Sequence, residues 1–329
     1  MQLKMKTLVV LAILMGTETL SQSRIDPIQL IKDKIDSTVE SNNVPAVSVA
    51  IVREAIVLQN LLQENKIQLD QPITDFFPNT FNPKKEKELS QITIEKILHH
   101  HAGLPRVTNS AYKRKDGDPY EYDYKAEDFI TDLKKIKLRK EAFRYSNFGY
   151  GLLAHVAERA TNKSFSELLN TYLIEPYELN STSLELGELG QSVTPYRKDD
   201  RNVETKPWRM GKMTPPSAIY SNIKDLSKLM RIQINAYNKQ DQETNSPLIL
   251  SNNTRLLGPE STVSYGYGLF VGQSGTYGHG GDNDGFGCEY SFSVVDNYGI
   301  VLLTSSGGLW IPELYKEINQ ILKDAIKLD

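Results

Sequence analysis

Cysteine is nearly absent from the 329-residue sequence, in which Cys288 is the only one. A single cysteine cannot form an internal disulfide, and no cysteine follows the N-terminal apolar segment to accept a lipid. Cys288 lies in the alternating run FGCEYSFSVV, a pattern typical of a buried strand. Because thiols in such strands are usually inert, we expect Cys288 to be structural rather than nucleophilic.

The sequence also lacks a basic excess and any apolar segment long enough to cross a membrane. Its formal net charge is −3 and its pI is near 6.0, whereas binding to nucleic-acid phosphates depends on clustered positive charge. The hydrophobic fraction of 39% is sufficient for a real core. We therefore expect a globular protein that does not bind nucleic acid.

The first 23 residues have the layout of a secretory signal peptide. Lys4 and Lys6 precede an apolar run from residue 8 to 15, and small and polar residues follow around Ser21 and Ser23. The apolar run is too short to span a bilayer. We expect export to the periplasm or the medium, removal of residues 1–23, a mature domain of residues 24–329 and no membrane span after removal of the leader.

Patterns at the two ends of the chain predict one layered domain. Apolar spacing predicts a helix at 27–40, a strand at 45–53 and a helix at 55–64. Four β runs precede a helix at about 312–327, namely YGYGLFVG, TYGHG, GFGCEYSFSVVD and GIVLLTS. We expect an α/β fold of the α+β kind, with an antiparallel sheet flanked by N- and C-terminal helices. Its sheet portion would come from about 27–54 and 262–329, and a mostly helical insertion from about 55–261.

The segment FRYSNFGYGLLAHVAERATNKSFSELL combines helix signals with polar side chains. Ser146 or Asn147 is placed to cap a helix that ends at Asn162. Tyr145, Ser146 and Asn147 would then lie where backbone N–H groups point outward, which suits an anion or a polarised carbonyl. An ordinary capped helix explains this stretch equally well.

A second polar segment, TYGHGGDNDGFG, places His279 at the end of a strand, followed by Gly280 and Gly281. Two glycines allow a ligand to approach the backbone closely. A hairpin that happens to contain a histidine is the simpler interpretation of this stretch alone.

Together, Tyr–x–Asn at a helix start and His–Gly–Gly on a later strand resemble the second and third motifs of the serine β-lactamase and penicillin-binding-protein superfamily. The resemblance is greatest to its class C and esterase-like branch. The stretch ITIEKILHHHAGLP resembles that superfamily's helix and turn, with His100 in its histidine position, and PPSAIYSNIKDLSKLM and YGYGLFVG follow in the same order. The resemblance covers nearly the whole mature chain. It implies a β-lactamase/transpeptidase-like fold and acyl transfer through a serine ester, without a cofactor.

The resemblance also implies roles for the motif residues. Tyr145 would be the general base or its partner, Asn147 would position substrate, and His279 would take the position often held by lysine. Histidine in that position favours an esterase-like or peptidase-like ancestor over a dedicated penicillin-hydrolysing enzyme.

A substrate-binding edge would follow on the same strand. Gly280 and Gly281 would keep this edge open, and the N–H of Asp282 would donate one oxyanion hydrogen bond. The expected ligand is a small molecule or peptide with an amide, ester or β-lactam group.

The superfamily's first motif, a Ser–x–x–Lys pair at the start of a buried helix, has no identifiable counterpart. The strand VPAVSVAIVR joins the helix AIVLQNLLQE almost directly, so the family's second strand and the start of its nucleophile helix are missing. An ungapped count places Ser48 in the serine position but Ile51 in the lysine position. Two other pairs have the spacing without the strand-to-helix context, Ser110–Lys113 and Ser221–Lys224.

Three consecutive histidines, His99 to His101, do not predict a metal site. Neighbouring residues on a helix point roughly 100° apart, so the three cannot converge on one ion. We expect a structural His100, hydrogen-bonded behind the site.

The sequence therefore favours an exported protein of the serine-hydrolase family that is impaired or inactive without its nucleophile, because loss of the nucleophile removes nearly all covalent catalysis. The alternative is a non-catalytic pseudo-enzyme whose cleft binds a peptide, a glycan or a partner protein.

Overall fold

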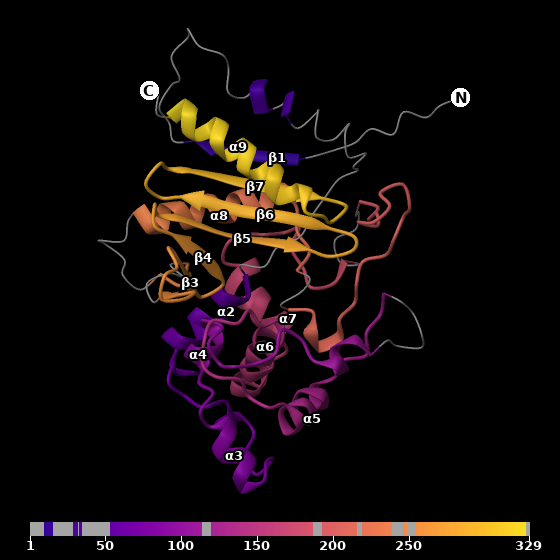
Figure 1. Ribbon diagram of the computed structural model, residues 1–329, viewed down its shortest axis with the longest axis vertical. Helices are drawn as coiled ribbons and strands as arrows, with labels where there is room; N and C mark the ends of the chain where they lie inside the picture. The colour runs from indigo at the N-terminus through magenta and orange to yellow at the C-terminus, as the bar shows by residue number, and fades with distance from the viewer. Residues whose placement is uncertain are drawn as a thin grey trace.

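In the part of the chain that the computed structural model describes, seven strands form one antiparallel sheet, in the upper half of Figure 1. These residues are 10–15, 29–31, 33–34, 53–113, 120–186, 193–215, 219–238, 246–248 and 254–326. The strand order is β1-β7-β6-β5-β4-β3-β2. The strands are β1 (Val10–Met15), β2 (Thr254–Leu256), β3 (Val263–Gly266), β4 (Leu269–Gly272), β5 (Thr276–Asp282), β6 (Gly287–Ser293) and β7 (Tyr298–Thr304).

Most of the helices lie below the sheet in Figure 1, and α9 lies above it. The α-helices are α2 (Arg53–Gln63), α3 (Pro83–Leu89), α4 (Ile94–Leu98), α5 (Ala126–Lys135), α6 (Asn147–Thr161), α7 (Phe165–Leu169), α8 (Ile223–Asn238) and α9 (Trp310–Ile326). Shorter helical turns are η1 (Ile73–Phe76), η2 (Asn109–Tyr112), η3 (Asn170–Ile174) and η5 (Gly211–Met213).

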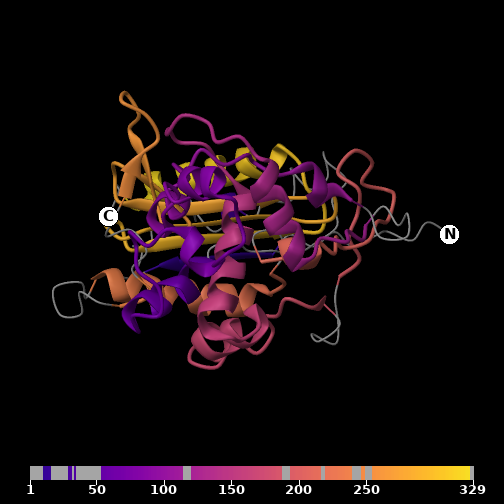
Figure 2. The same ribbon diagram turned by 90° about the horizontal axis from the view of Figure 1, so that it is seen from below.

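Strand β7 is buried on both faces, which explains its continuous apolar sequence. Val301 and Leu303 belong to the large core shared with the helical part, whereas Ile300 and Leu302 pack in a separate cluster with α9. Figure 2 shows α8 and α9 on opposite sides of the sheet. The expected α/β fold, an antiparallel sheet with a helical portion, is confirmed.

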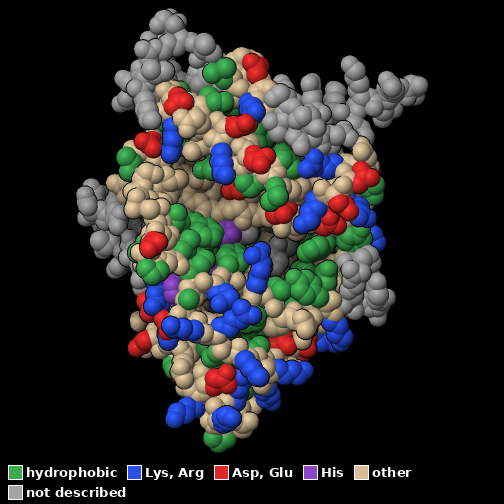
Figure 3. Space-filling model, in the orientation of Figure 1, with side chains coloured by type: hydrophobic (Ala, Val, Ile, Leu, Met, Phe, Trp, Pro, Cys, Tyr) green, Lys and Arg blue, Asp and Glu red, His purple; other side chains and the backbone are tan. Residues whose placement is uncertain are grey.

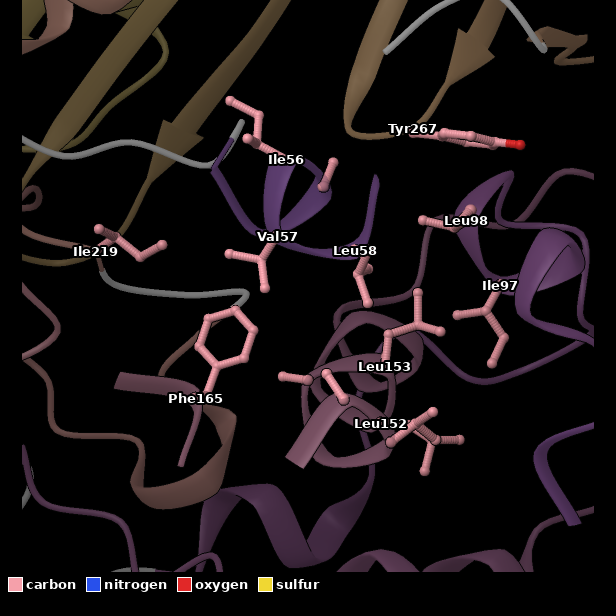
Figure 4. Close-up of a cluster of buried hydrophobic side chains, with 14 of the residues drawn as sticks. Ile56, Val57, Leu58, Ile97, Leu98, Leu152, Leu153, Phe165, Ile219 and Tyr267 are labelled. Atoms are coloured by element: carbon pink, nitrogen blue, oxygen red, sulfur yellow. The ribbon is translucent and has the colours of Figure 1, made fainter. Parts of the chain in front are cut away.

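Helix α2 lies at the centre of the large core. Its residues from Ala55 to Leu58 are at most 1% exposed. Figure 4 shows Ile56, Val57 and Leu58 pointing in different directions from one turn, among side chains of α4, α6 and α7. A helix that is apolar on several faces is stable only where other elements cover each face.

The structure corrects one expectation about the strands. YGYGLFVG is not one run but parts of β3 and β4, joined by a tight turn at Tyr267 and Gly268. Gly268 has a φ of 84°, a conformation that glycine adopts without strain. Its N–H donates to the hydroxyl of Tyr150 at 2.9 Å, so a contact with α6 stabilises the turn.

The N-terminal expectations are only partly covered by the described residues. Residues 29–31 and 33–34 are helical, as expected, and Ile31 packs in the cluster around α9. Arg53, expected at the end of a strand, is the first residue of α2. Residues 45–52 of the expected strand lie outside the described part.

The apolar run that predicts a signal peptide contains β1. Its six residues pair with β7 from Val10 opposite Leu303 to Met15 opposite Tyr298. Cleavage after the predicted leader would remove this strand and leave the outer edge of β7 without it. Export and cleavage stay predictions.

We expect a chain that begins at residue 24 to be less stable than the full chain, because the backbone groups of β7 would lose their pairing with β1. Urea unfolding followed by circular dichroism should show a lower midpoint, and size-exclusion chromatography should show concentration-dependent self-association through the exposed strand. A chain that begins at residue 10 keeps β1 and serves as the control. Equal midpoints for the chains that begin at residues 10 and 24 would show that β1 contributes no stability.

Candidate active site

A cavity of about 570 Å³ lies where β5 meets the start of α6 and the start of α9. The six site residues predicted from sequence all line it, namely Tyr145, Asn147, His279, Gly280, Gly281 and Asp282. The face drawn in Figure 3 is hollowed between the sheet and the helices, with hydrophobic side chains along the hollow. A larger hollow of about 1180 Å³ shares Trp208 with this cavity, but none of the six residues lines it.

Local hydrogen bonds at the start of α6 position Tyr145 and Asn147. Ser146 caps the helix, since its hydroxyl accepts the N–H of Gly149 at 2.9 Å. The same hydroxyl donates to the carbonyl oxygen of Pro105 at 2.6 Å, which fixes the helix start against the preceding turn. The expected left-handed end of this helix at Asn162 is also present, with a φ of 56°.

The imidazole of His279 links the strand to α6. Its Nδ1 lies 2.6 Å from the carbonyl oxygen of Gly280, so Nδ1 carries the hydrogen. Its Nε2 lies 3.3 Å from the hydroxyl of Tyr145, which must therefore donate. Burial lowers the pKa of His279 to about 4, so the ring is neutral at physiological pH.

His100 supports Tyr145 from behind. Its ring centroid is 4.4 Å from that of Tyr145, and its Nδ1 accepts the N–H of Ser146 at 3.1 Å. Burial lowers the pKa of His100 well below its usual value, so this ring is also neutral. Among the described residues, no group of three metal-ligating side chains is placed to hold an ion.

Two cavity residues were not predicted from the sequence. The guanidinium carbon of Arg106 lies 5.4 Å from the ring centroid of Tyr145, within the range of a cation–π contact. Glu289 lies opposite Gly280 in the β5–β6 register. A Cβ at position 280 would lie 2.6 Å from its Oε1, so a side chain there would require the Glu289 carboxylate to move.

Sequence signals for these two residues were weak. Arg106 directly follows the Gly–Leu–Pro turn, and Glu289 is a lone carboxylate in an apolar strand. Burial raises the pKa of Glu289 to about 7. A partly buried carboxylate with a raised pKa in a cavity is a candidate functional group.

The alternative Ser–x–x–Lys pairs lie outside the cavity. The hydroxyl of Ser110 donates to Asp132 at 2.7 Å. Ser221 is 7% exposed and hydrogen-bonds to Thr182 at 2.8 Å. Both serines therefore have structural roles in the fold.

Comparison with protein-family models matches residues 35–311 to the Beta-lactamase family. The chain belongs to the beta-lactamase family. The match includes the start of α6, strand β5 and the cavity between them, so the resemblance noted in the sequence is confirmed.

Curated relatives of this beta-lactamase family member are distant and longer. Protein flp of Staphylococcus aureus (strain MW2) is 22% identical over 283 residues, which cover 80% of this chain and 53% of that protein. A beta-lactamase-like protein of Arthroderma benhamiae is 23% identical over 301 residues, which cover 81% of this chain and 49% of that protein. The chain thus spans about half the length of these relatives.

Solved structures agree on the beta-lactamase fold. A class C beta-lactamase mutant has a TM-score of 0.72 at 13% identity and covers 92% of this chain and 99% of its own. A D-stereospecific amidohydrolase from Streptomyces sp. has a TM-score of 0.65 at 18% identity, covering 85% and 95%. Identities this low establish the fold alone.

We expect Glu289 to make the stability of the protein depend on pH. Its pKa rises from 4.5 in the unfolded chain to about 7 in the folded protein, so unfolding releases a proton between these values. The free energy of unfolding should therefore fall as pH rises through this range. In Glu289→Gln this contribution should be absent, as urea unfolding of both proteins at a series of pH values will show.

Glu260 provides the control, because its carboxylate is exposed. Glu260→Gln should keep the pH dependence of the original protein. If the stability difference between the original protein and Glu289→Gln does not change with pH, Glu289 is not the buried acid inferred here.

Proposed function

We propose that this protein is an exported relative of serine hydrolases whose cavity binds a small molecule or peptide with an amide, ester or β-lactam carbonyl. It would not turn this ligand over through a serine ester. The proposal rests on the retained second and third motifs and on the missing first motif.

The sequence of α2 is the observation that carries the proposal. Its eleven residues, REAIVLQNLLQ, include neither serine nor lysine. Ala55 to Leu58 direct apolar side chains into the core. Of the described residues that line the cavity, none is a serine or a lysine either. A site that keeps the general base but has no nucleophile can still bind the ligand, but it cannot form a serine ester with it.

The cavity supports ligand binding by its composition. Trp208, Phe270 and Met210 supply apolar and aromatic surface, and Asn147 and the strand edge at Gly280 and Gly281 supply polar groups. Concave sites that combine an apolar lining with a few polar groups usually bind small molecules.

A working serine hydrolase is the second candidate, favoured by the hydrogen bond between Tyr145 and His279. It requires a serine that precedes α2. Ser48 is the residue that an ungapped count supplies; it lies outside the described residues, and Ile51 stands where the family's lysine would be.

Covalent labelling tests the proposal. Purified full-length protein is incubated with a fluorescent penicillin and with a fluorophosphonate, digested, and analysed by mass spectrometry. We expect no adduct on any serine and no steady-state hydrolysis of the penicillin. A penicillin that occupies the cavity should change the fluorescence of Trp208 in a saturable way, and Trp208→Phe should lose most of that change.

Ser48→Ala is the matched control and should behave as the original protein does. A serine adduct that disappears in Ser48→Ala, or steady-state hydrolysis of the penicillin, would establish the working hydrolase instead.

A further inference from the structure

A chain of hydrogen bonds in the cavity has the three parts of a nucleophilic site. Tyr145 is placed as the nucleophile, His279 as the base and the Gly280 carbonyl as the group that orients the base. The Tyr145 hydroxyl donates to Nε2 of His279 at 3.3 Å, and Nδ1–H of His279 donates to the Gly280 carbonyl at 2.6 Å. In hydrolases this order of donors activates a hydroxyl for attack. Tyrosine is among the side chains that form covalent intermediates.

Arg106 adds positive charge beside the same phenol. Its guanidinium carbon lies 5.4 Å from the Tyr145 ring centroid. In the described residues, no carboxylate forms an ion pair with Arg106. An arginine remains charged at all physiological pH values, so its field stabilises negative charge that develops on the Tyr145 oxygen.

We propose that Tyr145 is itself an acyl acceptor, which activated esters modify once per molecule in this cavity. The Tyr145 oxygen forms a bond to the carbonyl carbon, and the ester's alkoxy or aryloxy group leaves with its electron pair. The phenolic proton moves to Nε2 of His279 and from there to solvent. The product is an O-acyl tyrosine. This inference rests on the proposed function, because a serine in the cavity would react in place of the phenol.

His279 is neutral and its Nε2 can accept the phenolic proton, but its low pKa makes it a weak base, so the charge of Arg106 beside the phenol is needed as well. The pKa of His279, about 4, leaves Nε2 unprotonated at neutral pH, so it accepts the hydrogen bond in every molecule. A ligand in the cavity can reach Tyr145, since this residue lines the cavity and is only partly buried. His100 behind it holds the ring at 4.4 Å.

The experiment uses 4-nitrophenyl acetate with the full chain. We expect a burst of about one equivalent of 4-nitrophenolate and an acetyl group on the peptide that contains Tyr145, identified by mass spectrometry. Tyr145→Phe should lose this burst and the modified peptide. His279→Gln should slow the acetylation of Tyr145 by about a hundredfold, the low end of the usual effect of a general base.

Two substitutions test whether the positive charge of Arg106 contributes to the reaction. Arg106→Gln should slow acetylation of Tyr145 about tenfold, since one cation near a phenol contributes at that scale, and Arg106→Lys should restore most of the rate. Circular dichroism of each variant confirms that it has folded.

Tyr172 provides the matched control, because its hydroxyl also donates a hydrogen bond, to Glu64 at 2.8 Å, but it does not line the cavity. Tyr172→Phe should keep the full burst. Acetylation of Tyr145 no faster than that of Tyr172 would overturn the inference and leave the proposed function intact. An adduct on a serine would overturn both.

Discussion

Burial of the first turns of α2 is the constraint on which the rest of the structure depends. Ala55, Ile56, Val57 and Leu58 are at most 1% exposed and join the core that the sheet shares with the helices. The buried isoleucine, valine and leucine side chains contribute roughly 1.5–3 kcal/mol each, so this turn stabilises the junction of the two portions. The same junction brings the start of α6 and strand β5 close enough for the contact between Tyr145 and His279.

The burial of this turn also limits which catalytic side chains α2 can carry. A lysine in this turn would be a charge in an apolar core, which is costly unless it is paired and hydrogen-bonded. Helix α2, which has neither serine nor lysine, therefore packs in the core without a buried charge. The polar and charged groups of the cavity come from other elements. Arg106, from the loop after α4, is the described cavity residue that carries positive charge beside Tyr145.

Local signals in the sequence located the helix start and the strand whose residues line the cavity. The cap at Ser146 and the left-handed Asn162 depend on hydrogen bonds within a few residues, so α6 could be located in advance. Tyr145 and Asn147 followed from that helix, and His279 from its glycine-flanked strand.

Contacts between distant segments could not be predicted in this way. The turn at Gly268 depends on Tyr150, which is 118 residues away. The alternation of YGYGLFVG gives no sign of this contact, so the pattern predicts one strand where the structure has two. Glu289 lies beside Gly280 only because of the β5–β6 register, which the sequence does not specify.

The charges of the cavity follow from these long-range contacts. His279, with a pKa of about 4, is neutral at any pH well above that value, and Glu289, with a pKa of about 7, gains its charge only near neutrality. The carboxylate of Asp282 accepts the N–H of Gly308 at 2.9 Å and lies 3.7 Å from Nζ of Lys198, so it has partners other than Arg106. Arg106 lines the cavity, and no carboxylate of the described residues forms an ion pair with it. At mildly acidic pH its positive charge is thus not balanced by Glu289. Because Glu289 adds a negative charge as pH rises through about 7, we expect an anionic ligand to bind more tightly below that pH than above it.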